Sequence, residues 1–287
     1  MAAWVLLLVA FSVARAAPVE IDPNPTALMQ AMQGHRIVLL GEVHDNAAQH
    51  ELRAGALRQL VVNGARPAIG FEQFDREHQA DIERARRARP KDVDYMIEQA
   101  KGNPGWDWGY YRPFIKLAFE YDLPIIAANL SSGKALRVAT DGWQALFDAK
   151  ARTELKLDEL PADFLRKHEE AIAAGHCNLL PIEALPAQAR AQMARDIVLA
   201  QAIRPYLDGG VVLLAGNGHV RRDIGVLFWL PANVARGALS IGMLERDADG
   251  LARKFDSEFD AYVITERAVR ADPCKDLEKR LQPSKKH

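Results

Sequence analysis

A short apolar run that ends abruptly in a glycine and polar side chains constrains the fold of this chain more than any other feature. Residues 37–40 read Ile-Val-Leu-Leu, and Gly41, Glu42 and His44 follow closely. A run this short, with β-branched residues, is typical of a parallel strand buried on both faces. Gly41 allows a tight turn, and Asn46 is a good N-cap for a helix that begins near residue 47. The pattern predicts a strand–turn–helix unit with Glu42 and His44 at the carboxyl end of the strand.

The same pattern recurs far down the chain. Residues 211–214 read Val-Val-Leu-Leu and lead through a glycine to Asn217 and His219. Two intermediate apolar runs end in Glu72 and in Asn129. Open α/β sheets bind ligands at the carboxyl ends of their strands, so four neighbouring parallel strands would bring these side chains together along one edge. The candidate site residues are therefore Glu42, His44, Glu72, Asn129, Asn217 and His219.

The rest of the pattern predicts a single α/β domain over residues 17–287, with a mostly parallel central sheet flanked by helices. Residues 238–244 and 261–265 are expected to form two further strands. The amphipathic, charged segment from about 141 to 206 predicts a helical insertion, in which Met193 lies on a packing face. The net charge of −1 provides no field that would recruit nucleic acid.

The first 16 residues predict a signal peptide. Residues 4–11 form an apolar core, and Ala14-Arg15-Ala16 fits the small–x–small rule for cleavage, although no Lys or Arg precedes the core. A membrane-spanning helix needs about 20 apolar residues, more than this run supplies. No cysteine follows the cleavage point, so a lipid anchor is not expected. We therefore predict an exported, periplasmic protein.

Cys177 and Cys274 are the only cysteines. Two interpretations stay open, because the pair is either two unrelated small residues or a disulfide that ties the tail to the middle of the chain. An exported protein with an even cysteine count is compatible with a disulfide. The geometry of the two residues decides between the interpretations.

Residues 103–113 combine turn formers with four large aromatic side chains, Trp106, Trp108, Tyr110 and Tyr111. Aromatic side chains often do no more than cap a core. A planar apolar ligand uses the same mixture, namely aromatic walls, a phenol that could bind iron, and an arginine such as Arg112 for a carboxylate.

These motifs resemble those of the ChaN-like haem-binding family, within a wider grouping that includes Tiki, TraB and erythromycin-esterase-like proteins. The matching segments, in family order, are residues 39–46, 71–76, 106–113, 126–129 and 215–221. The resemblance implies an exported α/β protein that binds haem and serves haem or iron uptake. It also implies a tyrosine as iron ligand and paired haems stacked across a homodimer. Tyr111 matches the aromatic position best.

In the haem-binding hypothesis, the polar edge and the aromatic segment hold the ligand, and Tyr111 or His219 binds the iron. Arg112, Lys134 or Arg221 would meet the propionates as charged hydrogen-bond donors. The chain has no Cys-x-x-Cys-His motif, which excludes covalent attachment of haem. The expected partners are haem, a second copy of the chain and an outer-membrane haem receptor.

The alternative hypothesis is a metal-dependent hydrolase. Glu42, His44, Glu72 and His219 would bind a divalent metal ion, or act as acid and base. Residues two apart near a strand end need not point the same way once the strand has ended, so Glu42 and His44 need not reach one ion.

Overall fold

The computed structural model describes residues 17–102, 104–246 and 258–281. The predicted signal peptide, residues 1–16, lies outside these ranges. Within them, no helix combines the length and the apolar character needed to cross a membrane.

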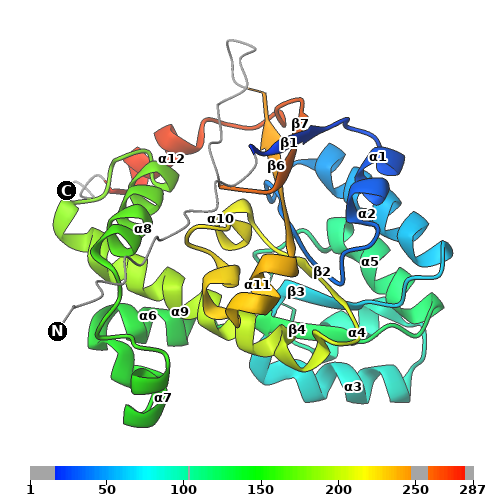
Figure 1. Ribbon diagram of the computed structural model, residues 1–287, viewed down its shortest axis with the longest axis horizontal. Helices are drawn as coiled ribbons and strands as arrows, with labels where there is room; N and C mark the ends of the chain where they lie inside the picture. Colours follow the sequence, from blue (N-terminus) through cyan, green and yellow to red (C-terminus); the bar gives the residue numbers. More distant parts are fainter. Residues whose placement is uncertain (1–16, 103, 247–257, 282–287) are drawn as a thin grey trace, which may run out of the picture.

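A single parallel sheet runs through the described part of the chain (Figure 1). Its seven strands lie in the order β1-β7-β6-β2-β5-β3-β4, and every strand pair is parallel. The sheet confirms the predicted α/β class. The strands are β1 (Val19–Ile21), β2 (Ile37–Leu40), β3 (Ala68–Asp75), β4 (Ile125–Asn129), β5 (Val211–Leu214), β6 (Leu239–Glu245) and β7 (Ala261–Thr265).

The four strands that carry the candidate site are consecutive in the sheet. The two Ile-Val-Leu-Leu-like runs pair directly, with Leu40 opposite Leu214, and Phe71 of β3 lies opposite Leu214 on the other side. β4 closes this half of the sheet beside β3. Since all four strands run the same way, their carboxyl ends open onto one edge, as the sequence pattern predicts.

Helices cover both faces of the sheet (Figure 1). On one face the strands pack against α1 (Pro25–Met32), α2 (Ala47–Val62), α3 (Gln79–Ala88), α4 (Val93–Gln99) and α5 (Trp108–Glu120). On the other face they pack against α6 (Ser132–Asp141), α8 (Ala162–Gly175), α9 (Leu185–Ile203) and the 3-10 turn η5 (Val226–Trp229). Apolar cover on both sides explains why the strands are continuous apolar runs. The remaining helices are α7 (Ala149–Glu154), α10 (Asn217–Val220), α11 (Ala232–Gly237) and α12 (Pro273–Leu281).

The segment 141–206 is helical, as predicted. It contains α7, α8 and α9 together with the 3-10 turns η2 (Trp143–Ala145), η3 (Ile182–Ala184) and η4 (Arg204–Tyr206). Met193 is buried in the apolar layer of α9, where the helical spacing places it.

Helix α5 begins at Trp108, so about half of residues 103–113 is helical although the segment is rich in turn formers. The Asp107 side chain caps the helix by accepting a hydrogen bond from the Gly109 N–H at 2.9 Å. The chain after β7 contains α12, and Cys177 and Cys274 form a disulfide with their Cα atoms 5.6 Å apart. The structure therefore favours the disulfide over two unrelated cysteines.

Candidate functional site

A cavity of about 950 Å³ opens at the carboxyl edge of the sheet. Its volume lies near the upper end of the roughly 300–1,000 Å³ that is usual for ligand pockets. The ends of β2, β3, β4 and β5 contribute to its wall, and the segment before α5 and the middle of α9 complete it. The structure brings all six residues of the predicted edge to this cavity, namely Glu42, His44, Glu72, Asn129, Asn217 and His219.

Glu42 is the buried centre of one half of the site. Its carboxylate forms an ion pair with Arg53 of α2, and both side chains are fully buried. The Tyr111 hydroxyl donates a hydrogen bond to the same carboxylate, and Nδ1 of His44 lies 2.7 Å from Oε1. Burial alone would raise the pKa of Glu42, but Arg53 and His44 hold it well below its usual range. Glu42 is therefore a permanent anion that orients its neighbours.

His44 presents an oriented imidazole to the cavity. Its side chain is 48% exposed, while Nδ1 is held by Glu42. The ring meets Trp106 edge-on at 4.7 Å and lies against Gly216, where a Cβ atom would stand 2.8 Å from the His44 Cε1 atom. Burial lowers the pKa of His44, but Glu42 and Glu72 outweigh it, so the pKa is raised. Both residues lie beyond the end of β2 at Leu40, and Glu42 and His44 point toward each other rather than apart.

His219 lies between two carboxylates in the other half of the site. Its Nδ1 is 2.7 Å from Asp196 Oδ1, and its Nε2 is 3.4 Å from Glu72 Oε1. The Gly216 N–H donates a hydrogen bond to Glu72 Oε2 at 2.7 Å. Burial opposes the charged form of His219, yet Glu72 and Asp196 raise its pKa to about 10. For Asp196 the effect of burial is the larger one: it raises the pKa of this carboxyl to about 6, although the charge of His219 opposes the rise.

The charge of His219 predicts how stability depends on pH. A histidine whose pKa rises from 6.5 to about 10 on folding contributes stability that is complete below pH 6.5 and is lost as the pH rises through 10. We expect ¹⁵N NMR to show the His219 ring still protonated at about pH 9. The wild type should have a larger free energy of unfolding than His219→Asn. The difference between the two should be largest near about pH 6 and should shrink as the pH approaches 10. A difference that stays constant over this range would mean that His219 is neutral in the folded protein.

Asn217 has a structural task as well as a place in the cavity wall. Its side-chain amide donates to the Met243 carbonyl at 2.6 Å and accepts from the Met243 N–H at 2.9 Å. The backbone of β2 leaves the sheet after Gly41. Beyond that point the Asn217 amide makes the hydrogen bonds to β6 that a strand backbone would otherwise make. The Asn217 N–H also donates to the Glu42 carbonyl at 3.1 Å, which joins the two glycine turns.

The far end of the cavity is polar and carries one cation, Arg195, and one carboxylate, Asp75. Arg195 of α9 donates hydrogen bonds to Asn129 Oδ1 at 3.1 Å and to the Leu130 carbonyl at 2.6 Å. Ser132, at the first position of α6, and Asp75, at the end of β3, line the same end. Burial and the neighbouring Glu77 raise the pKa of Asp75.

Sequence reasoning missed Asp196 and Arg195, because the α9 pattern indicates a packing helix. The signal that could have found Asp196 is a lone acid beside Ile197 within an apolar stripe, since an unpaired buried carboxylate is costly.

Four predicted residues lie elsewhere. Tyr111 is fully buried, and its hydroxyl points at Glu42 rather than at the cavity, which its neighbour Tyr110 lines instead. Arg112 pairs with Asp94, Lys134 pairs with Glu77, and Arg221 pairs with Asp223 and Glu258; none of the three lines the cavity. Consecutive residues of a helix differ by about 100° in direction, so Tyr110 lines the cavity while Tyr111, which was predicted to do so, points into the core.

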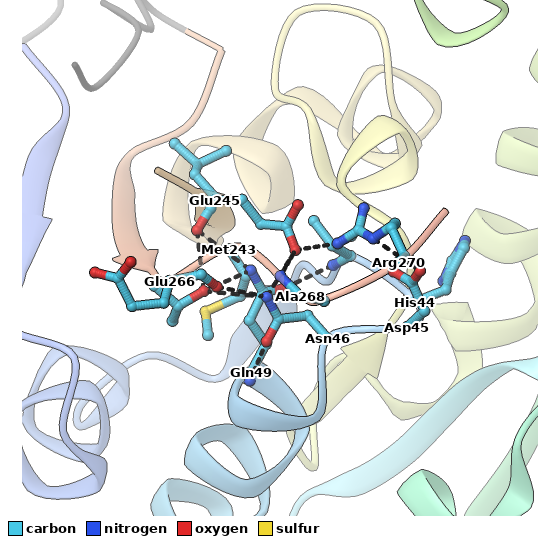
Figure 2. A network of polar contacts seen from close by, with 12 residues as sticks. His44, Asp45, Asn46, Gln49, Met243, Glu245, Glu266, Ala268 and Arg270 are labelled. Carbon is cyan, nitrogen blue, oxygen red and sulfur yellow. Dashed lines mark hydrogen bonds and ion pairs between the residues drawn. The ribbon is translucent and has the colours of Figure 1, made fainter. Parts of the chain in front are cut away.

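A polar network holds the turn that carries His44 (Figure 2). The Asn46 side chain accepts a hydrogen bond from the Gln49 N–H at 3.2 Å, which confirms the predicted N-cap of α2. Asn46 also donates to Glu245 Oε1 at 2.7 Å and to the Glu266 carbonyl at 3.0 Å. The turn is therefore fixed to the ends of β6 and β7.

Within the described ranges, no group of three His, Cys, Asp or Glu side chains is arranged to hold a metal ion. The carboxylates of Glu42 and Glu72 are engaged by Arg53, His44, His219 and the Gly216 N–H. The divalent-metal form of the hydrolase hypothesis is thus unsupported. His44 retains the orientation of a general base, so the acid–base form stays a prediction.

The fold and the cavity define a class of α/β protein with a ligand site at the carboxyl edge of a parallel sheet. A family model described as "Haem-binding uptake, Tiki superfamily, ChaN" matches residues 28–230, and the chain belongs to this family. No curated protein matches the sequence. A solved structure described as "Cofacial heme binding to ChaN of Campylobacter jejuni" is similar in fold, with a TM-score of 0.62 and 18% identity over 82% of this chain and 89% of that chain.

Two other solved structures are more remote. The type III effector HopBA1 has a TM-score of 0.46 and 12% identity over 91% of this chain and 100% of that one. The erythromycin esterase EreC, in an open conformation, has a TM-score of 0.45 and 16% identity over 78% of this chain and 72% of that one.

Proposed function

We propose that this protein binds haem in the cavity at the carboxyl edge of the sheet and serves haem or iron uptake. The observation that carries the proposal is the division of the cavity into an aromatic end, with Trp106 and Tyr110, and a polar end that holds Arg195. A haem has the matching division between its apolar ring and its two propionates. The haem-binding description of the family and the cofacial haem binding of ChaN from Campylobacter jejuni support the same ligand.

The residues at the aromatic end fit a haem. Trp106 and Tyr110 line the cavity beside His44. The Tyr110 ring stacks on the buried His50 ring, with centroids 4.4 Å apart and an interplanar angle of 4°, and this contact fixes its orientation. Tyrosine is an established protein ligand of haem iron. We therefore propose Tyr110, rather than Tyr111, as the iron ligand. The bound haem would supply the iron that the protein carries.

Arg195, at the polar end, fits the propionates. Arg195 is held in place by Asn129 and by the Leu130 carbonyl. Ser132 opens helix α6, whose capping residue Ser131 makes no side-chain cap, so the first N–H groups of the helix add favourable partial charge for an anion.

A haemin titration of the chain without residues 1–16 tests the proposal. We expect a Soret band that shifts on binding, because the iron exchanges solvent for a protein ligand. Tyr110→Phe should remove or shift this band, since it deletes the phenol that faces the cavity. Arg195→Gln should keep the band and weaken haemin binding by about tenfold, the loss expected for one charge-assisted hydrogen bond.

Tyr111→Phe is the matched control. It removes one hydrogen bond to Glu42 and should lower the free energy of unfolding by about 1 kcal/mol without altering the Soret band. Loss of the band in Tyr111→Phe alone would assign the iron to Tyr111. Absence of any spectral change in the unmodified chain would refute haem binding.

A role in haem or iron uptake also requires that the protein is exported and that it receives haem from a partner. We propose export through the signal peptide to the periplasm, pairing of two copies on haem binding, and delivery from an outer-membrane haem receptor. Amino-terminal sequencing of the exported chain and sedimentation with and without haemin test the first two steps.

A further inference from the structure

A short segment after β7 crosses from the edge of the sheet to the helical layer. We call residues 266–272 the strap; they join β7 to α12. The strap is bound to the end of β6, because the Ala268 N–H donates to Glu245 Oε1 at 3.0 Å (Figure 2). It is bound to the His44 turn as well, because Asn46 donates to the Glu266 carbonyl. The strap therefore rests on the same turn that positions His44.

Arg270 connects the strap to the cavity wall. Its guanidinium pairs with Glu245, and its Nε lies 2.9 Å from Asp45 Oδ2 (Figure 2). Asp45 lines the cavity and follows His44 directly. The Arg270 and Glu245 side chains are only 20% and 13% exposed, so this pair is less screened by solvent than an ordinary surface ion pair. A displacement of Arg270 would release the Asp45 side of the turn.

The far end of the strap is held by a covalent bond rather than by a core. Helix α12, all of whose residues are described, contains no buried residue. Its second residue, Cys274, is bonded to Cys177 at the end of α8, and the two helices lie together in Figure 1. Without apolar burial there is little to keep α12 in place once the bond is broken.

The Cys177 end of the bond is held in an unfavourable backbone conformation. Cys177 has a φ value of +56°, in the left-handed region that most side chains avoid, and Asn178, of a residue type that tolerates this region, follows at +57°. Such residues persist where their surroundings fix them. Both cysteines are partly exposed, so a thiolate from solution can reach the bond.

We propose that the Cys177–Cys274 disulfide is a redox latch on the ligand cavity. A thiolate of a dithiol reductant attacks one sulfur of the bond and releases the other protein sulfur as a thiolate. The second thiolate of the reductant then attacks the reductant sulfur of the mixed disulfide and displaces the remaining protein thiolate, which leaves two protein thiols and an oxidised reductant. Helix α12 and the strap then loosen, Arg270 leaves Asp45, and the His44 turn loses one of its fixed contacts. The ligand that this loosening releases is haem only if the proposed function is right, but the latch itself is a property of the protein alone.

Hydrogen exchange without any ligand tests the latch first. With the full mature chain, oxidised or reduced with dithiothreitol, we expect the N–H groups of Ala268 and Asn46 to exchange at least about tenfold faster after reduction. The double variant Cys177→Ser, Cys274→Ser should match the reduced protein with or without dithiothreitol. Equal exchange in the oxidised and reduced protein at both positions would overturn the latch.

Haemin affinity then tests its link to the cavity. Reduction should weaken haemin binding by on the order of tenfold. Arg270→Ala in the oxidised protein should reproduce this loss, and dithiothreitol should weaken its affinity no further. A further loss on reduction of Arg270→Ala would show that Arg270 does not transmit the effect. If the oxidised protein does not bind haemin but its strap and turn loosen on reduction, the latch stands and the proposed function fails.

Discussion

Replacing Arg53 by methionine should lower the free energy of unfolding by about 3–5 kcal/mol, the usual consequence of removing one partner of a buried ion pair. Arg53 and Glu42 are both fully buried, and Arg53 also donates to the Leu40 carbonyl at 3.2 Å. Methionine fills a similar volume, so the main loss is electrostatic. It would leave the fully buried Glu42 carboxylate without its strongest cationic partner. Chemical denaturation followed by circular dichroism measures the change.

Arg58 supplies the matched control. It lies on the same helix, α2, and pairs with Glu120, but the two side chains are 53% and 47% exposed. Exposed ion pairs of this kind contribute little to stability, so Arg58→Met should be nearly neutral. Similar losses in the two variants would mean that Arg53 acts through helix propensity or packing rather than through the charge of Glu42.

Gly41→Ala should cost about 2–4 kcal/mol, from overpacking and the disruption of two hydrogen bonds. A Cβ atom on Gly41 would lie 2.3 Å from Asn217 Oδ1 and 2.9 Å from the Ile241 carbonyl oxygen. The second neighbour is backbone and cannot rotate away, while movement of Asn217 would break its pair of hydrogen bonds to Met243. The same denaturation measurement applies, and we expect the turn that carries Glu42 and His44 to shift with it.

Gly133→Ala is the control for this substitution. Gly133 lies in α6, and a Cβ atom there would meet nothing within 4 Å. Alanine is favoured over glycine in helices by about 0.5–1 kcal/mol, so this variant should be neutral or slightly more stable. If Gly41→Ala were as stable as the wild type, the turn would have room for a Cβ atom, contrary to the close approach of Asn217.

The sheet and its polar edge could be predicted because both follow from local patterns. Each apolar run ends in a glycine or in a polar residue, and parallel strands share their carboxyl edge, so Glu42, Glu72 and His219 had to meet if their strands were neighbours. No local sequence pattern determines the strand order that makes these strands neighbours. That order is set by packing of helices on two faces.

The site residues that could not be predicted from the sequence lie in segments with a strong apolar or aromatic pattern. Asp196 and Arg195 belong to α9, whose apolar stripe dominates its appearance, although one pairs with His219 and the other lines the cavity. Tyr110 and Tyr111 could not be separated, because their directions depend on where α5 starts. The start is fixed by the Asp107 cap within a segment rich in turn formers.

Asn217 has one wider consequence. Its amide imitates a peptide group, so β6 keeps a bonded neighbour beyond the point where β2 has turned away. The chain after Gly41 is thereby released from sheet pairing, and its side chains are free for chemistry while the sheet stays continuous. A single asparagine thus lets the sheet continue past the turn that carries Glu42 and His44.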